Sequence, residues 1–514
     1  MLTFIQGLTL TLMPLLSAKA MVIAWLLLPF LAAFLAAVLP PLARWLALLC
    51  SLATTAMAVA IQLGGLPGSV ELLGAYGVAL NTDAFAVPFL LLNALVCSAV
   101  VIDSWRRPLP GPFLLLLMVL HGGLCTAFVV IDLISLYVTL EVVGISAFLL
   151  ILISRSDRSL WVALRYLLIG NTVMTLFLIG AALVYLERGS FRFEAVASTT
   201  SIAALALILV GLLMKSGLFL SGLWLPVTHA EAPAEVSALL SGVVVTAGIA
   251  PLLRFSSGVP ALGPVITGIG LASAVLGLVF ALADADAKRL LAWSTLSQMG
   301  LVALSPVAGG FYALSHGTAK AALFLVARRF PNRALQGWRE RPLPAGVWWP
   351  LCIGSLSIVG LPPLAGFTAK AGLSAGLSLP LEVTVTLLSM GTAAAYARFW
   401  GAPLIRRPAC SSVAGAGSAA GADSPEPAWS LGVILLVLAL VVIGAVALPW
   451  TEKPASAAAK TGLVLLGGWG LHHLLEGEGL RLRQRLRLPE LEGLSDLLGG
   501  IGVVGAGLLV ILNR

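Results

Sequence analysis

Isolated ionisable side chains interrupt several long apolar runs of this sequence. They are Glu141, Arg165, Lys215, His316, Lys320 and Lys370. A charged side chain at the centre of a membrane helix costs at least about 2.5–3.5 kcal/mol on insertion scales, so such residues are expected to have a function. A succession of these groups on different spans is typical of the proton relays in pumps and transporters. The residue types therefore predict proton transfer across a membrane.

These residues occupy different positions within their runs. Glu141 is in the middle of LYVTLEVVGISAFLL, whereas Arg165, in VALRYLLIGN, lies near the start of its run. His316 and Lys320 are four residues apart in ALSHGTAKAALF, so a helix would place them on one face. For any one of them the alternative is a structural ion pair or a long side chain that reaches the membrane surface, and Arg165 suits that alternative best.

Composition indicates the environment of the elements that hold these residues. Only 10% of the residues are charged, 60% are hydrophobic and the mean hydropathy is +1.05, whereas a soluble domain has roughly 25% charged residues. The chain is predicted to be an all-α polytopic membrane protein with about 14–16 transmembrane helices, because apolar stretches long enough to cross a bilayer recur along it. The expected spans are 21–40, 42–63, 83–103, 112–130, 131–153, 161–187, 203–226, 235–254, 262–283, 289–307, 308–329, 349–376, 378–400, 429–449, 460–475 and 496–512.

Basic residues are distributed unevenly between the loops. If the loops alternate across the membrane, 19 of the 30 basic residues fall on one side. These are Arg44, Arg106, Arg107, Arg155, Arg158, Lys288, Arg289, those of the run Arg328–Arg341, Arg398, Arg406, Arg407 and those of the run Arg481–Arg487. Basic loops mark the cytoplasmic side, so the net charge of +8 is a topology signal rather than a nucleic-acid surface. The predicted location is a bacterial plasma (inner) membrane or a thylakoid membrane.

Two of the expected spans contain helix breaks beside a lysine. The first break includes Pro226 and Pro233, and the second includes Pro362 and Pro363. His229 lies within the first break and joins the candidate proton carriers. A broken helix frees backbone carbonyl and amide groups that need polar or watery surroundings. The breaks therefore predict hydrated, titratable positions near the middle of the membrane.

The breaks fall in corresponding helices of two groups of five spans. Because five is odd, the second group must cross the membrane in the opposite sense, which predicts an inverted repeat with an ion path at its interface. The expected divisions are amino-terminal helices in 1–111, a first repeat in 112–254, a second in 262–400, a low-complexity loop in 401–428 and carboxyl-terminal helices in 429–514.

Four segments carry a family resemblance. In chain order they are WLPVTHAEAPAEVSALLSG, DAKRLLAWSTLSQMG, SHGTAKAALFL and LPPLAGFTAK. They resemble WLPDAHxxAPTPVSALL, DLKRLLAYSSISQMG, THAFFKALLFL and IPPLSGFxxK of the antiporter-like subunits shared by Mrp-type cation/proton antiporters and respiratory complex I. The resemblance covers residues 112–400 and is weak outside them. It implies two inverted five-helix repeats, other membrane subunits as partners in a larger complex, and proton movement along a hydrated central axis.

The resemblance also implies roles for particular residues. By motif position, Glu141 and Lys215 match the family's first-half glutamate–lysine pair. Lys320 matches its central lysine, and Lys370 matches the terminal lysine of the second half. A lysine rather than a glutamate at position 370 favours the D-like branch of Mrp antiporters, or the N-like subunit of complex I, over the M-like subunit.

Three positions depart from the family pattern. Val227 replaces an aspartate after WLP, Glu235 replaces the second proline of APTP, and Thr246 stands where D-type and N-type members carry a lysine. The threonine hydroxyl can still donate and accept a hydrogen bond, and its smaller side chain leaves room for water. Thr246 is therefore expected to face the interior, between Lys215 and the helix face that carries His316 and Lys320.

Other patterns in the sequence predict no cofactor and no metal. The five cysteines are scattered without zinc-ligand or redox spacing. Residues 500–505 spell GxGxxG, but they lie in an apolar run without a preceding strand, so a helix-packing face is the better interpretation. His472 and His473 are adjacent and would point to different faces of a helix.

The leading hypothesis is a proton-conducting subunit of a multisubunit antiporter that exchanges a monovalent cation, Na⁺, for H⁺. One alternative couples the same proton path to redox chemistry in a complex I-like NADH dehydrogenase or a membrane hydrogenase, with partner subunits supplying the redox centres. Another couples it to inorganic-carbon uptake. A non-conducting structural paralogue is a further alternative, because of Thr246. A lipid-modifying enzyme would need a cluster of acidic or nucleophilic groups at a membrane face, and the sequence presents none.

Overall fold

The computed structural model describes residues 18–66, 68–72, 77–338, 340–405, 430–448, 454–475 and 493–513. Most of the expected low-complexity loop, the basic run Arg481–Arg487 and residues 1–17 lie outside these ranges.

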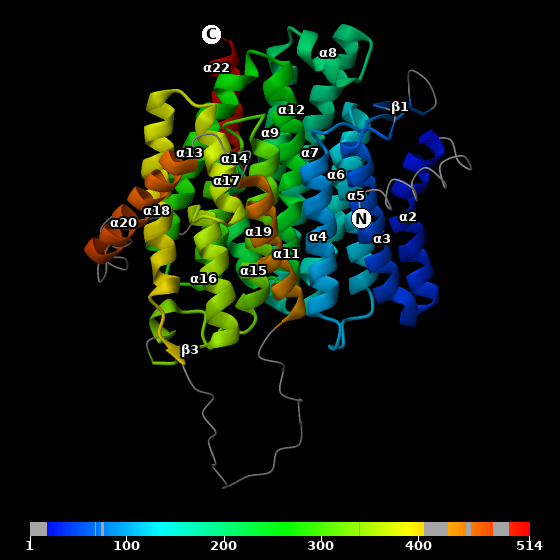
Figure 1. The fold of residues 1–514 in the computed structure, drawn as a ribbon. Coiled ribbons are helices and arrows are strands. Elements are labelled where there is room, and N and C mark those ends of the chain that lie inside the picture. The colour runs from blue at the N-terminus through cyan, green and yellow to red at the C-terminus, as the bar shows by residue number, and fades with distance from the viewer. Residues whose placement is uncertain are drawn as a thin grey trace.

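Helices form most of the described chain and pack side by side in one bundle (Figure 1). Those of the first half are α2 (Ala18–Val38), α3 (Ala43–Gln62), α4 (Val87–Asp103), α5 (Phe113–Val129), α6 (Leu133–Ile151), α7 (Asp157–Arg188), α8 (Phe193–Ser198), α9 (Ile202–Ser216), α10 (Leu225–Glu231), α11 (Ala234–Leu239) and α12 (Thr246–Gly258). Those of the second half are α13 (Leu262–Ala283), α14 (Ala287–Val302), α15 (Gly309–Ala327), α16 (Ala345–Val359), α17 (Ala365–Ala375), α18 (Leu379–Trp400), α19 (Leu431–Ala447), α20 (Pro454–Leu475) and α22 (Leu494–Leu512).

Strands are short and lie in the connections between helices. β1 (Ser69–Glu71) pairs antiparallel with β2 (Ala79–Asn81), and β3 (Leu343–Pro344) pairs parallel with β4 (Leu404–Ile405). A buried aspartate fixes one of these connections. Asp132 caps α6 by accepting a hydrogen bond from the Ser135 amide at 2.7 Å, and its other carboxylate oxygen accepts one from the Ala79 amide at 3.0 Å.

The prediction of an all-α polytopic membrane protein is confirmed. Among the described residues, 7 helices are long and apolar enough to cross a membrane, and α9 with the following short helices makes an eighth candidate as a bent pair. Four further apolar helices are shorter, at 10–17 residues. The larger number of spans and the inverted repeat stay predictions.

The middle of the chain forms the core of the bundle. In the candidate span Ala234–Gly258 the whole apolar window is buried, whereas the other candidate spans bury between 28% and 50% of theirs. α14 and α15 are also buried along most of their length. The helices that carry Thr246 and Lys320 are therefore enclosed by other helices, where a polar side chain can avoid lipid.

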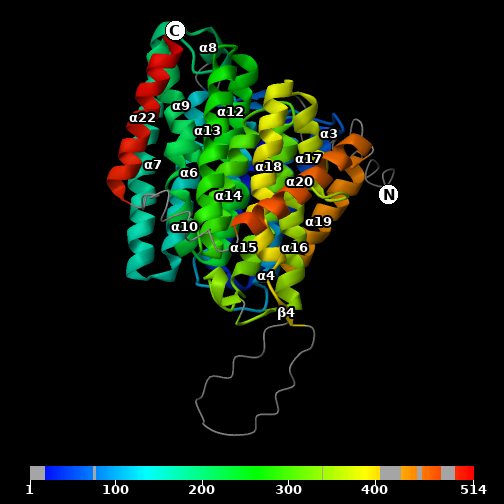
Figure 2. The same cartoon turned by 90° about the vertical axis from the view of Figure 1, so that its left-hand side faces the viewer.

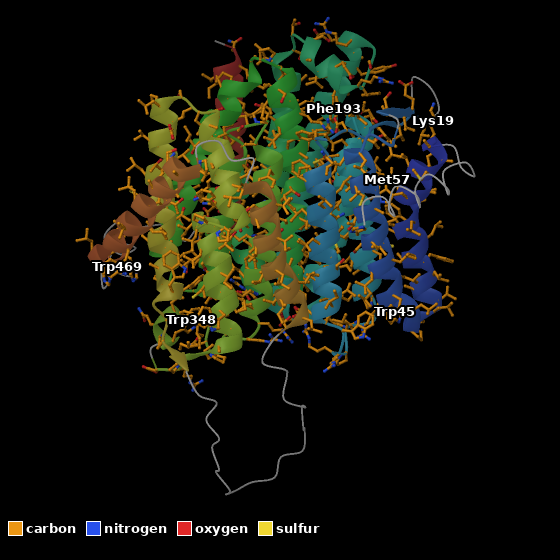
Figure 3. All side chains as sticks on the ribbon, in the orientation of Figure 1. Lys19, Trp45, Met57, Phe193, Trp348 and Trp469 are labelled. Atoms are coloured by element: carbon orange, nitrogen blue, oxygen red, sulfur yellow. The ribbon has the colours of Figure 1, made fainter. Side chains whose placement is uncertain are left out.

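Large apolar side chains cover the outside of the bundle. Phe34 is 73% exposed, Leu186 80% and Leu387 60%. Trp45, also exposed, and Trp348 lie toward the same end of the bundle in Figure 3. Apolar outer surfaces with tryptophan near one end are typical of helices surrounded by lipid.

Several loops that were expected on one side of the membrane are in contact at one end of the bundle. Arg44 Nη2 donates to the Arg107 carbonyl at 2.7 Å, and Arg107 Nη1 lies 2.6 Å from Glu235 Oε1. Arg158 Nε lies 3.9 Å from Glu231 Oε1. These contacts agree with the alternation of the loops. That this end faces the cytoplasm stays a prediction.

The two carboxyl-terminal helices pack on opposite parts of the bundle (Figures 1 and 2). α22 lies along α9, where Gly500 approaches Leu220 and Gly505 approaches Val210. The GxGxxG segment is thus part of a helix-packing face. α20 runs obliquely across α18 in both views, and Gly468 is so close to α18 that a Cβ there would lie 2.4 Å from the Ala393 Cβ.

Candidate functional site

Glu141 on α6 and Lys215 at the end of α9 form an ion pair inside the first half. Lys215 Nζ lies 3.6 Å from Glu141 Oε1, and their side chains are 7% and 18% exposed. The same ammonium donates to the Leu140 carbonyl at 3.3 Å. Helix α6 therefore supplies both a carboxylate and a backbone carbonyl to the lysine, and both oxygens stabilise its protonated form.

Two glycines make room for this ammonium. A Cβ at Gly144 of α6 would lie 2.8 Å from Lys215 Nζ, and one at Gly170 of α7 would lie 3.8 Å from it. The lysine tip therefore rests against the backbone of α6 and close to α7. Sequence reasoning missed Gly144, because a glycine in an apolar helix gives no sign of which side chain lies against it.

Arg165 is on α7, the helix that also carries Gly170. It is 2% exposed, so it lies inside the bundle rather than reaching outward to the membrane surface. The structure thus places Arg165 in the interior of the first half.

The first break begins one turn earlier than the proline pattern indicates. α9 ends at Ser216, and Gly217 caps it in the left-handed conformation, with φ of 65°. A short 3-10 turn, Phe219–Gly222, leads to α10, and the helix pair is bent by 44°. Pro226 lies in the first turn of α10, where a proline is tolerated. Pro233 lies directly before α11.

The break exposes a carbonyl that a side chain satisfies. Trp224 Nε1 donates to the Met214 carbonyl at 3.0 Å, next to Lys215. A buried indole needs a hydrogen-bond partner, and a broken helix needs donors for its last carbonyls. This contact therefore fixes the end of α9 at the lysine.

Thr246 follows a π-helical segment, Leu240–Val244, and is 0% exposed. Its Oγ1 donates to the Val243 carbonyl at 2.6 Å. α12, which begins with Thr246, packs against α9 and α15, the helices that carry Lys215 and Lys320. The expectation that Thr246 faces the interior agrees with its burial. Single-turn π segments occur often at functional sites.

Lys320 lies fully buried on α15, with no carboxylate within 4.0 Å among the described residues. Its Nζ donates to the Leu291 carbonyl at 2.6 Å and to the Tyr396 hydroxyl at 2.9 Å. The Tyr396 hydroxyl in turn lies 2.9 Å from Ser294 Oγ. A lysine, a phenol and a serine hydroxyl thus form a hydrogen-bonded chain from α15 through α18 to α14. Sequence reasoning did not identify Tyr396 or Ser294.

Two histidines lie near Lys320 with unused ring nitrogens. His229 on α10 and His316 on α15 are 0% and 3% exposed. Within the described part of the chain, neither ring has a hydrogen-bond partner. The charge of Lys320 acts on both rings, and that of Lys370 acts on His316. Buried polar atoms without partners are costly, so these nitrogens are suited to hydrogen bonds with water along a path through the bundle.

The second break places Lys370. α16 ends at Val359 and Gly360 follows in a left-handed conformation, with φ of 100°; Pro362 and Pro363 then lead to α17. Lys370 Nζ donates to Ser389 Oγ of α18 at 3.1 Å. In both halves of the chain a glycine in the left-handed conformation therefore ends a helix close to a lysine inside the bundle.

A charge cluster at the basic end was not foreseen. Asp103, whose side chain is 1% exposed, pairs with Arg107 at 2.5 Å and with Arg328 at 4.0 Å. Glu235 pairs with the same two arginines, at 2.6 Å and 3.8 Å. The two cations explain how a glutamate is accommodated at the start of α11. The sequence shows each charge, but not that three separate helices bring them together.

The described residues contain no group of three or more His, Cys, Asp or Glu side chains that could hold a metal ion. Chemically, the arrangement offers amines, imidazoles, hydroxyls and a carboxylate on successive helices. These groups can hold and pass protons.

Comparison with known proteins agrees with this arrangement. A family model described as the transmembrane part of NADH:quinone oxidoreductase and Mrp antiporters matches residues 131–394. Subunit 14 of the NADH-quinone oxidoreductase of Thermus thermophilus is 33% identical over 325 residues, which are 59% of this chain and 70% of that protein. The D-type subunit of the Na⁺/H⁺ antiporter of Alkalihalophilus pseudofirmus is 28% identical over 375 residues, which are 63% of this chain and 74% of that protein.

The fold also resembles a chain in the structure of the Mrp complex from Dietzia sp., with a TM-score of 0.74 and 21% sequence identity. The similarity covers 96% of this chain but 59% of that one. The chain therefore spans less than two thirds of that neighbour's length.

Proposed function

The chain belongs to the transmembrane family of NADH:quinone oxidoreductases and Mrp antiporters, and we propose that it conducts protons across the membrane as one subunit of a multisubunit complex. The observation that carries the proposal is the Glu141–Lys215 ion pair, 3.6 Å apart at a helix break inside an apolar bundle. A buried amine beside a carboxylate can switch between holding and releasing a proton when their separation changes.

The proposed path runs from this pair through the middle of the bundle into the second half. Thr246 lies on the helix between α9 and α15 and would hold water rather than carry charge. His229, His316 and Lys320 form the central group, and Lys370 ends the path. The inverted repeats 112–254 and 262–400 belong to this proposal, since they would place the two broken helices in equivalent positions.

The finer proposal is exchange of Na⁺ for H⁺ in an Mrp-type antiporter. It is supported by the similarity to the D-type subunit of a Na⁺/H⁺ antiporter and by the lysine at position 370. The partners would be other membrane subunits, and the basic end of the bundle would face the cytoplasm. Part of the cation route would lie in those subunits, so the chain alone would exchange no cations.

A second candidate is the proton-translocating subunit of a redox-driven complex. It is favoured by the higher identity to the NADH-quinone oxidoreductase subunit, 33% against 28% for the antiporter protein. The same proton path would serve both candidates, and the partner subunits would differ.

Purification from native membranes in a mild detergent tests the assignment. The antiporter proposal expects the chain to co-purify with several other small membrane subunits and without flavin or iron–sulfur absorbance. The complex should catalyse Na⁺-dependent proton movement in liposomes, and the single chain should not. Co-purification with flavin- or iron–sulfur-containing subunits would favour the redox-driven candidate. Robust Na⁺-dependent proton movement by the single chain would contradict the proposed dependence on partners.

A further inference from the structure

A cavity of about 380 Å³ opens beside Lys370, between α17, α18 and the oblique helix α20. Its polar lining includes Lys370, Ser374, Glu382, Ser389, Lys460 and Thr461. α20 lies beyond residues 131–394, which the family model matches. Figure 2 shows α20 lying across α18 and next to α17. A helix from the end of the chain thus forms one wall of a polar cavity at the second helix break.

Two side chains of α20 fix it to the break. Lys460 Nζ lies 2.8 Å from Glu382 Oε1 and donates to Ser374 Oγ at 3.1 Å. Thr461 Oγ1 donates to the carbonyl of Gly360, the residue that caps α16, at 3.0 Å. α20 therefore contacts the backbone of the break itself as well as a carboxylate on α18.

Exposure gives the cavity a direction. The Lys460 and Glu382 side chains are 29% and 36% exposed, so this ion pair lies at the outer part of the cavity. Lys370 lies deeper, and its Nζ donates to Ser389 Oγ. The ionisable side chains that line the cavity are these three, and the charge of Lys460 acts on Lys370.

We propose that the Lys460–Glu382 ion pair is a gate for proton exchange between Lys370 and the solution outside the bundle. This inference rests on the proposed function, in which Lys370 ends the proton path. In the closed state the Lys460 ammonium neutralises the Glu382 carboxylate, which makes the carboxylate a poor proton acceptor. The proton then stays on Lys370.

Opening the pair allows transfer. An N–H bond of the Lys370 ammonium breaks and water in the cavity carries the proton to Glu382, where an O–H bond forms. Lys370 becomes a neutral amine and Glu382 a neutral carboxylic acid, so charge is conserved. Glu382 then releases the proton to outside water, and Lys460 pairs with the restored carboxylate.

The alternative is a purely structural tether that holds α20 on the bundle. Thr461 provides a matched test, because Thr461→Val removes a second contact of α20 while leaving the gate charges in place. Glu71 and Arg192 form an exposed ion pair far along the chain, outside the cavity lining, and Glu71→Gln is the general control.

The experiment uses the whole complex in sealed vesicles with an internal pH indicator. It measures driven proton transport and the passive proton leak under an imposed pH gradient. Glu382→Gln should lower driven transport on the order of a hundredfold, as expected for loss of a positioned proton acceptor. Lys460→Gln should raise the passive leak severalfold, because the carboxylate is then free to accept protons. Lys460→Arg, which keeps the charge, should bring the leak back toward the wild-type level, and Glu71→Gln should change neither measurement.

Wild-type values for both Glu382→Gln and Lys460→Gln would overturn the gate. So would a Thr461→Val variant that reproduces the leak of Lys460→Gln, since the tether alone would then explain it. Lys370→Ala separates this inference from the proposed function. If Lys370→Ala keeps full transport, the proposed path fails; if it abolishes transport while the gate variants behave as wild type, only the gate fails.

Discussion

At the scale of single residues, the lysines inside the bundle differ in what neutralises or solvates their charge. Lys215 has a carboxylate at 3.6 Å, whereas Lys320 has a carbonyl and a phenol, and Lys370 has a serine hydroxyl. Glu141 is therefore the partner whose movement would most change the charge on a lysine in the first half. The sequence could identify the lysines, because a cation in an apolar run is conspicuous. It could not identify Tyr396, which reaches Lys320 from a helix 76 residues further along the chain.

Gly144→Ala tests how closely the Lys215 ammonium must be placed. The added methyl group would lie 2.8 Å from Nζ, so the flexible lysine tip must move away from its present position beside Glu141. Proton transport should fall roughly 10- to 100-fold, since a displacement of about 1 Å at a reacting group can cost that much. Gly268→Ala on α13 is the matched control, because nothing lies within 4 Å of its added Cβ. Equal transport by the two variants in vesicles would contradict the argument.

Thr246→Val and Thr246→Ser test the hydroxyl in the core. Serine keeps the oxygen that donates to the Val243 carbonyl, whereas valine keeps the shape and removes the hydrogen-bonding group. Proton transfer should be slower in the valine variant than in the serine variant, because water beside this residue would lose a polar neighbour. Initial rates of vesicle acidification check this. Equal rates would favour the non-conducting paralogue.

At the scale of elements, glycine rather than proline ends the broken helices. The prolines indicated correctly that the chain is interrupted in these regions, but α9 stops at Gly217 and Pro226 merely begins the next helix. A proline fits the first turn of a helix, so its position marks a start as readily as an end. The contact of α20 with the second break could not be predicted, because neither its hydropathy nor its spacing shows that it lies across α18.

Gly217→Ala should destabilise the first break. An alanine in the left-handed conformation costs about 1–2 kcal/mol, and its Cβ would lie 2.1 Å from Cδ1 of the buried Leu225. Gly189→Ala separates the two effects, because Gly189 has φ of 67° and nothing within 4 Å of an added Cβ. Both variants should lower the melting temperature of the purified complex, measured by tryptophan fluorescence, and Gly217→Ala should lower it more. An equal decrease would show that packing against Leu225 contributes nothing.

At the scale of the whole molecule, the distribution of charge and burial suits a subunit that moves protons while lipid surrounds it. The enclosed span Ala234–Gly258 and the buried helices α14 and α15 keep polar groups away from the apolar outer surface. The basic loops meet at one end through the cluster of Asp103, Arg107, Glu235 and Arg328. Composition was sufficient to predict the membrane and the helical fold, because hydropathy reports directly on the surrounding solvent. Which helices enclose which residues depends on packing, and the sequence does not show it.

Proton transport by complexes carrying Lys215→Ala or Glu141→Gln tests the central claim most directly. Each variant should lower driven proton transport in sealed vesicles on the order of a hundredfold or more, as expected when a positioned proton-transfer group is lost. The complex should still assemble, as shown by co-purification of its other subunits, and Glu71→Gln, in an exposed ion pair, should transport normally. Normal transport by an assembled complex carrying either Lys215→Ala or Glu141→Gln would contradict the proposed proton path.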